Sequence, residues 1–215
     1  MRTPPDPSTS RNPTVGKGMN RKTLPSVGQH RGKLSNVAEL RAVATEDLTP
    51  KETAALRGLL DDVFEDDFSQ EDWDHTLGGW HFVISEKEQP IAHASVVERV
   101  LTSRRRRYRT GYVEGVGVRE DARGCGHGRA VMTAASEYIR DNFELGALGA
   151  TEEGARLYQS LGWQRVLGPT LAEIDGKPQR TPDEDGYIFV LLTPCTGPFD
   201  LQAPLMCDWR TGDVW

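Results

Sequence analysis

The sequence predicts an α/β protein with a mixed β-sheet and one central crossover connection. Two observations support this fold class. Segments with the period-two pattern of strands alternate with segments that have the 3.6-residue pattern of amphipathic helices, in the order β-α-α-β-β-β-α-β-α-β-β. The chain has 215 residues, 37% hydrophobic and 27% charged, which is enough for one domain with its own core.

The cysteine and hydropathy patterns indicate a cytoplasmic protein without a metal site. Cys125, Cys195 and Cys207 are odd in number and widely spaced, which favours neither a disulfide framework nor a zinc site. No apolar run approaches the ~20 residues of a membrane span, and the N-terminus lacks a signal-peptide core. The histidines show no metal-ligand spacing and are expected to be structural or exposed: His75, His81, His93 and His127.

Charge is distributed unevenly along the chain. Residues 1–36 carry seven Lys or Arg and one acid and are rich in Pro, Ser, Thr and Gly, so we expect a disordered basic extension. This extension lacks the aromatic or amphipathic pattern of a nucleic-acid or membrane arm, and we expect neither partner. Residues 37–215 are the expected folded domain. Their net charge of −12, against −6 for the whole chain, either attracts cations or only aids solubility.

Two capping signatures mark the first helices, after a strand expected from Glu39 to about Ala44. Residues 49–52, TPKE, form a capping box with proline at the first helical position. Residues 69–72, SQED, repeat the signature and begin a short helix that ends before Gly78. Strands are then expected over residues 80–85, 91–100 and 111–118, with the arginines of residues 104–109 forming an exposed basic turn.

The stretch that follows the third of these strands has the composition of an anion site. Residues 123–128, RGCGHG, place Arg123, Gly126 and Gly128 in the pattern R-x-x-G-x-G, before an amphipathic helix expected over 129–142. Glycines allow close backbone approach, and the first helical N–H groups and the helix dipole favour a phosphate. The turn lacks the Lys-Ser/Thr of a P-loop. It predicts a pyrophosphate site, or otherwise an ordinary turn.

The last third is expected to hold shorter elements. Strands are predicted over residues 145–148, 163–166 and 187–192, and a helix over 152–161. Residues 168–186 are expected to be a loop, because they are rich in Pro, Gly and acids. Residues 194–215 show little periodicity and are expected to be ordered only by packing.

The R-x-x-G-x-G turn resembles the pyrophosphate-binding motif of the GCN5-related N-acetyltransferases (GNAT), and it follows the fourth expected strand. Residues 64–79, GYVE at 111–114 and CDWRTGDVW at 207–215 resemble the aminoglycoside 2′-N-acetyltransferases of mycobacteria and actinobacteria. The resemblance covers residues 38–215. It implies the GNAT fold, a mixed central sheet of about seven strands with helices on both faces. It also implies acetyl-CoA as the cofactor, a homodimer, and acetylation of the antibiotic's 2′-amino group that confers resistance.

The resemblance also implies direct transfer of acetyl in a ternary complex. Glu114 would take the proton of the substrate ammonium through a water. A bulge would free backbone N–H groups of residues 116–118 to stabilise the thioester oxygen. Tyr158 would protonate the leaving thiolate. Read alone, Glu114 also suits a pair with a local cation, and Tyr158 also suits a core aromatic with a backbone partner.

A polycationic aminosugar requires carboxylates around it, although each acid alone also suits surface solvation. Gly149, Trp80 and Glu184 depart from the family pattern and leave the substrate range open. The implied substrate-binding residues are Asp67, Asp72, Glu114, Gly115, Gly149, Glu184, Asp213 and Trp215, the last through its terminal carboxylate. The implied cofactor-binding residues are Val116, Gly117, Val118, Arg123, Gly124, Cys125, Gly126, His127 and Gly128.

Two other functions remain open from the sequence. The chain is either an acetyltransferase for another cellular amine, with aminoglycosides as incidental substrates, or a non-catalytic protein that binds acyl-CoA or aminoglycosides. The presence of both Glu114 and Tyr158 argues against the non-catalytic protein, since binding requires neither a base nor an acid.

Overall fold

Strands and helices alternate as expected in residues 38–215, the part of the chain that this computed structural model describes; the extension expected over residues 1–36 lies outside it. The elements are β1 (Glu39–Ala44), α1 (Pro50–Phe64), α2 (Gln70–His75), β2 (Trp80–Glu86), β3 (Gln89–Ser103), β4 (Arg106–Val118), α3 (His127–Asn142), β5 (Leu145–Gly149), α4 (Glu152–Ser160), β6 (Gln164–Arg165), β7 (Thr170–Ile174), β8 (Lys177–Arg180), β9 (Ile188–Leu192) and β10 (Leu205–Asp208).

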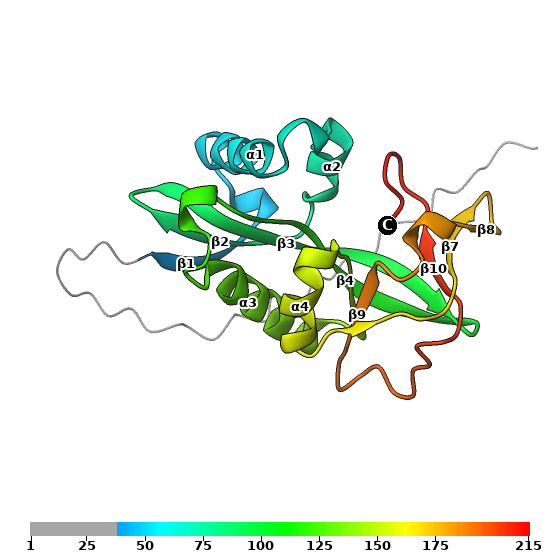
Figure 1. Cartoon of the computed structure of the whole chain (residues 1–215). Coiled ribbons are helices and arrows are strands. Elements are labelled where there is room, and N and C mark those ends of the chain that lie inside the picture. Colours follow the sequence, from blue (N-terminus) through cyan, green and yellow to red (C-terminus); the bar gives the residue numbers. More distant parts are fainter. Residues whose placement is uncertain (1–37) are drawn as a thin grey trace, which may run out of the picture. The chain divides into compact units, whose positions relative to one another are not determined.

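One mixed sheet joins all ten described strands. Its main path runs β6-β9-β5-β4-β3-β10-β7-β8, and β2 pairs with the other half of the long strand β3 and with β1. Helices α1 and α2 lie on one face of the sheet, and α3 and α4 lie on the other (Figure 1). Leu60 of α1 and Ile139 of α3 are fully buried on these opposite faces. No helix in residues 38–215 is long and apolar enough to cross a lipid bilayer.

The capping signatures act as predicted. Thr49 accepts from the Glu52 N–H and Glu52 accepts from the Thr49 N–H, with Pro50 at the first position of α1. Ser69 and Asp72 make the same reciprocal contacts at the start of α2. Both helices therefore begin at the residues that the sequence indicates.

Strands β4 and β5 separate midway, which leaves a gap in the sheet. They are parallel and pair only at Thr110, Gly111 and Tyr112 of β4 within the described residues. Val113, Glu114, Gly117 and Val118 of this segment are paired with β3 on their other side. Backbone groups on the β5 side of this segment therefore face the gap rather than a ladder partner.

A bulge interrupts β4 inside this separated segment. Two β4 residues, Gly115 and Val116, lie opposite the single residue Ala94 of β3. Gly115 has φ of +56°, the left-handed conformation that glycine adopts readily. The extra residue reverses the alternation of the strand, so that both Val113 and Val116 pack on the α3 face. The bulge expected near Gly115 and Gly117 is thereby confirmed, and the strict period-two pattern over residues 111–118 is corrected.

The sheet extends beyond the seven or so expected strands through β7, β8 and β10. The loop expected over 168–186 contains the β7–β8 hairpin, whose two-residue turn, Asp175-Gly176, has positive φ at both positions. Strand β8 is exposed throughout and so shows no apolar alternation. The tail expected to lack regular structure forms β10, which is antiparallel to β3 and parallel to β7. These pairings bring the C-terminal residues beside the centre of the sheet.

Candidate functional site

A glycine-rich turn joins β4 to α3 and forms the first part of the site. Gly124 and Gly126 have φ of +77° and +86°. Gly126 is the N-cap of α3, and within residues 38–215 no side chain caps this helix and no acid lies in its first turn. The first N–H groups and the positive end of the dipole therefore remain available to an anion. The glycine hollow, of about 350 Å³, is lined by Val118, Ala122, Arg123, Gly124, Gly126, His127, Gly128, Arg129 and Leu157.

A second hollow lies at the bulge of β4. Four carboxylates and no basic side chain are among its lining residues in the described chain, so it suits a ligand with several positive charges. Asp72 also serves the α2 cap, because its Oδ2 accepts from the Ser69 N–H at 2.9 Å. The acidic hollow, of about 430 Å³, is lined by Phe64, Asp67, Phe68, Ser69, Asp72, Glu114, Gly115 and Asp213.

Glu114 is a largely buried carboxylate of the acidic hollow, with 14% of its side chain exposed. Burial raises its pKa to about 7, although the charges of Arg210 and then Arg99 oppose this rise. Arg210 donates directly to the Glu114 carboxylate. A carboxylate with a pKa near neutrality is suited to accept a proton at working pH and release it again.

Arg210 connects Glu114 to the end of the chain. Its Nε donates to the Asp213 carbonyl at 2.7 Å, and its Nη2 donates to a backbone oxygen of Trp215. The guanidinium groups of Arg210 and Arg99 lie 5.5 and 4.9 Å from the ring centroid of Tyr112, within the range of cation–π contacts. Arg210 thus connects Glu114 with Asp213 and Trp215, and sequence reasoning did not select it.

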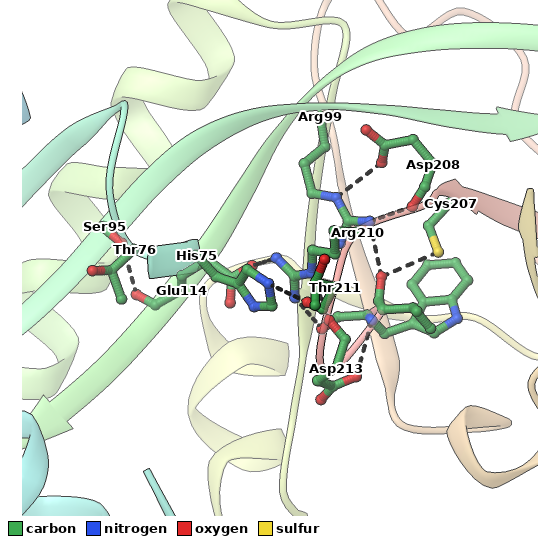
Figure 2. Close-up of polar contacts among 12 residues, drawn as sticks. His75, Thr76, Ser95, Arg99, Glu114, Cys207, Asp208, Arg210, Thr211 and Asp213 are labelled. Carbon is green, nitrogen blue, oxygen red and sulfur yellow. Dashed lines mark hydrogen bonds and ion pairs between the residues drawn. The ribbon is translucent and has the colours of Figure 1, made fainter. Parts of the chain in front are cut away.

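The C-terminal turn is anchored at several further points, drawn in Figure 2. Arg99 donates to the Asp208 and Val214 carbonyls at 2.7 and 2.8 Å, and His75 contacts the Thr211 carbonyl at 2.8 Å. The Trp215 N–H donates to Asp213 Oδ1 at 3.0 Å. These contacts order a segment that has little regular structure and fix Asp213 at the acidic hollow.

Tyr158 lies on α4, on the other side of β4 from the acidic hollow's helices. Its ring packs on Phe189 of β9, with centroids 6.4 Å apart. Burial raises the pKa of its hydroxyl to about 12, so the group keeps its proton at neutral pH. The neighbouring Leu157 lines the glycine hollow. A proton donor therefore lies on the helix that also borders the anion site.

The structure brings together most of the residues selected from the sequence, but not all. Trp215 does not line the acidic hollow, because its indole is buried in the core and donates to Thr181 Oγ1 at 2.9 Å. Glu184 does not line the acidic hollow either. Its pKa is raised mainly by desolvation and then by the negative charge of Asp213. Gly149 ends β5 and is exposed. Three expected cofactor residues lie outside the glycine hollow: Val116 and Gly117 in β4, and the exposed Cys125.

Together the two hollows flank one separated strand. An anion fits at the start of α3, a cation fits beside Glu114, and the bulge lies between the two in the sequence of β4. Within residues 38–215 no cluster of His, Cys, Asp and Glu has the arrangement of a metal site. The arrangement suits acid–base chemistry on an amine beside a phosphorylated ligand.

Comparisons with known proteins agree with this geometry. An aminoglycoside 2′-N-acetyltransferase from Mycolicibacterium fortuitum is 42% identical over 187 residues, which cover 86% of this chain and 95% of that protein. The GNAT protein YhbS from Escherichia coli, solved with CoA, has a TM-score of 0.58 at 15% identity and covers 83% of this chain and 93% of its own. Escherichia coli ElaA has a TM-score of 0.53 at 22% identity, and the match covers 72% of this chain and 99% of ElaA. Residues 43–163 match the acetyltransferase (GNAT) family, and the chain belongs to that family.

Proposed function

We propose that this acetyltransferase moves acetyl from acetyl-CoA to the 2′-amino group of aminoglycoside antibiotics. The observation that carries the proposal is the acidic hollow, which is lined by Asp67, Asp72, Asp213 and the largely buried Glu114. A polycationic aminosugar has the complementary charge. The name of the Mycolicibacterium fortuitum relative supports the same substrate.

The glycine hollow is the proposed site of the CoA diphosphate. Its backbone conformation fits this group, because Gly124 and Gly126 leave open space where a side chain would project. Arg123 adds a positive charge, while its Nε is held by the Val118 carbonyl at 3.2 Å. Acetyl-CoA supplies an activated thioester, and the chain's own residues hold it and move the protons.

Glu114 is the proposed general base. The amine arrives as an ammonium, and its proton passes through a water to the Glu114 carboxylate. The free amine then attacks the acetyl carbon, and the backbone N–H groups of residues 116–118 stabilise the charge that develops on the carbonyl oxygen. As the carbon–sulfur bond breaks, Tyr158 gives its proton to the sulfur, and the attacking nitrogen loses its surplus proton, which returns through water to the Tyr158 oxygen. Glu114 releases the first proton to solvent. The products are the acetylated amine and the free thiol of CoA.

The proposal extends to the cellular setting. The thiols of Cys125, Cys195 and Cys207 are free, which supports a cytoplasmic location. Acetylation removes one positive charge from the antibiotic, and we propose resistance as the consequence. A homodimer is proposed on family resemblance alone.

A thiol-release assay tests the proposed activity. The full chain, mixed with acetyl-CoA, is expected to release thiol on addition of gentamicin or tobramycin and to act more slowly on a panel of metabolic amines. Comparable rates on a metabolic amine would favour a different physiological substrate. No release with any amine would contradict the proposal.

Asp67 offers a test of the acidic hollow through charge alone, because it is exposed and lines the hollow. We expect Asp67→Asn to raise the KM for aminoglycoside about two- to fivefold, the effect of one exposed ion pair, with little change in kcat. Asp62→Asn removes the same charge from the exposed face of α1 and should leave KM unchanged. Equal behaviour of the two variants would show that the hollow does not attract the substrate.

Arg210 allows a test of the pKa of Glu114. Deprotonated Glu114 is the active form, so kcat/KM should fall as pH drops through about 7. Arg210 lowers this pKa, and Arg210→Gln should therefore move the acid limb of kcat/KM to higher pH, by about one to three units for a close opposite charge. The exposed Arg41, paired with Glu52, provides the control Arg41→Gln. An unchanged or more acidic limb in Arg210→Gln would contradict Glu114 as the titrating base.

A further inference from the structure

Two buried histidines behind the bulge have no part in the chemistry described so far. We propose that His93, held by His81 and Thr45, is a positioning residue that sets the direction of the bulge peptides of β4. The inference rests on the proposed function, because those peptides are the ones assigned to the carbonyl oxygen of the acetyl group.

The histidines belong to one chain of hydrogen bonds. His93 Nδ1 lies 2.7 Å from the Gly115 carbonyl oxygen, and His93 Nε2 lies 2.9 Å from His81 Nδ1. His81 Nε2 lies 2.8 Å from Thr45 Oγ1. Both imidazoles are fully buried. The chain runs from the bulge to the turn before α1.

The end of this chain fixes where its protons lie. A carbonyl oxygen only accepts, so a neutral His93 carries its proton on Nδ1 and accepts at Nε2. A neutral His81 then donates from Nδ1 and accepts at Nε2 from the Thr45 hydroxyl, which is closer to this nitrogen, at 2.8 Å, than to the Gly79 carbonyl oxygen, at 3.1 Å. Thr45 Oγ1 in turn accepts from the Gly78 and Gly79 N–H groups at 3.0 and 3.2 Å. For two neutral imidazoles, the chain of bonds therefore allows one tautomer of each.

Burial favours this neutral form. Desolvation lowers the pKa of His81 to about 3, with a further contribution from His93. It also lowers the pKa of His93 to about 4, against the opposing hydrogen bond to Gly115. The chain of bonds should therefore stay intact across the pH range in which Glu114 titrates.

Peptide geometry links His93 to the proposed chemistry. In a trans peptide the C=O and the next N–H point in opposite directions, so the bond to the Gly115 oxygen also fixes the direction of the Val116 N–H. Ser95 Oγ donates to the Glu114 carbonyl at 3.2 Å and fixes the preceding peptide in the same way. Side chains of β3 thus replace the ladder bonds that a bulge disrupts.

The close packing at Gly115 leaves little room for another arrangement. A Cβ at this position would lie 3.0 Å from Thr76, 3.1 Å from Leu60 and 3.4 Å from His93 Nδ1. The carbonyl therefore has an imidazole donor on the packed side. Without that donor it would be a partly buried acceptor that lacks its imidazole partner, and the peptide would be expected to rotate toward water.

Substitution of His93 tests the inference by a split between kcat and KM. We expect His93→Leu to lower kcat by up to about a hundredfold, the cost of a misplaced reacting group, with little change in the KM for acetyl-CoA or aminoglycoside. His93→Asn retains an N–H near the Nδ1 position and should restore most of kcat. Ser95→Ala should also lower kcat, because it removes the hydroxyl that holds the Glu114 carbonyl. It deletes only one hydroxyl and is therefore a smaller change than His93→Leu.

Ser136→Ala is the matched control for lost stability. Ser136 is a buried hydroxyl on α3 that accepts from Trp163 Nε1 at 3.0 Å, on the opposite face of the sheet. It should lower the melting temperature and leave kcat unchanged. A folded His93→Leu with wild-type kcat would overturn the inference, as would a loss of kcat in Ser136→Ala that matches its loss in His93→Leu.

Imidazole nitrogen NMR of the wild-type chain supplies a readout that does not depend on any variant. We expect two histidines that stay neutral between pH 6 and 9 and carry the proton on Nδ1, the less common tautomer of the free side chain. A proton on Nε2 of His93 would overturn the inference even in an active enzyme. A wild type that releases no thiol would instead contradict the proposed function, and with it the catalytic part of the inference.

Discussion

Glu114→Gln is expected to lower kcat for aminoglycoside acetylation by about 10²- to 10⁴-fold, the usual contribution of a general base. Glutamine has the same shape and keeps an oxygen that accepts from Arg210, so the hollow and the C-terminal turn should stay in place. The substitution removes the ability to take a proton and one negative charge, so the main effect should be on kcat, with a smaller effect on the KM for aminoglycoside. The measurement is the rate of thiol release at varied concentrations of aminoglycoside and of acetyl-CoA. The affinity for acetyl-CoA is determined separately.

The pH dependence of the Glu114→Gln deficit adds a second criterion. As pH rises, a larger share of the substrate amine arrives without its proton, so the deficit should become smaller. Glu98→Gln is the matched control, because Glu98 is an exposed glutamate of β3 that pairs with Arg109. Full activity of Glu114→Gln at neutral pH would remove Glu114 from the mechanism.

Tyr158→Phe is expected to have the second largest effect, also about 10²- to 10⁴-fold in kcat if protonation of the thiolate limits the reaction. The pKa of about 12 keeps the hydroxyl protonated at neutral pH, and phenylalanine keeps the ring contact with Phe189. CoA binding should therefore survive.

Tyr108→Phe is the control for removal of a buried tyrosine hydroxyl. Tyr108 lies on β4 near the basic turn, in contact with Phe199. It should leave kcat unchanged. If Tyr158→Phe and Tyr108→Phe are both fully active, the proton for the thiolate comes from water or another group.

The sequence predicted the features that depend on local chemistry. Capping residues placed α1 and α2 correctly, and the glycines before α3 indicated an anion site because their backbone conformations are encoded in the residues themselves. The bulge was implied by the family resemblance, and Gly115 and Gly117 made it plausible; Gly115 adopts the required positive φ without strain.

The features that the sequence did not predict depend on contacts between distant segments. Nothing near Arg210 indicates that it pairs with Glu114, 96 positions earlier, and the His81–His93 pair has no local signature. The burial of the Trp215 ring in the core was also not predicted; its backbone oxygen, the group expected at the substrate site, accepts from Arg210. The dipeptide Asp175-Gly176 favours a two-residue hairpin turn, and it could have predicted the β7–β8 hairpin from the sequence.

A comparison of kanamycin B with kanamycin A tests the central claim most directly. The two antibiotics differ at one position, where kanamycin B has a 2′-amino group and kanamycin A has a 2′-hydroxyl. The account predicts rapid thiol release with kanamycin B, a product acetylated at the 2′-nitrogen by NMR, and no release with kanamycin A. Equal release with both antibiotics, or acetylation at another nitrogen, would contradict it.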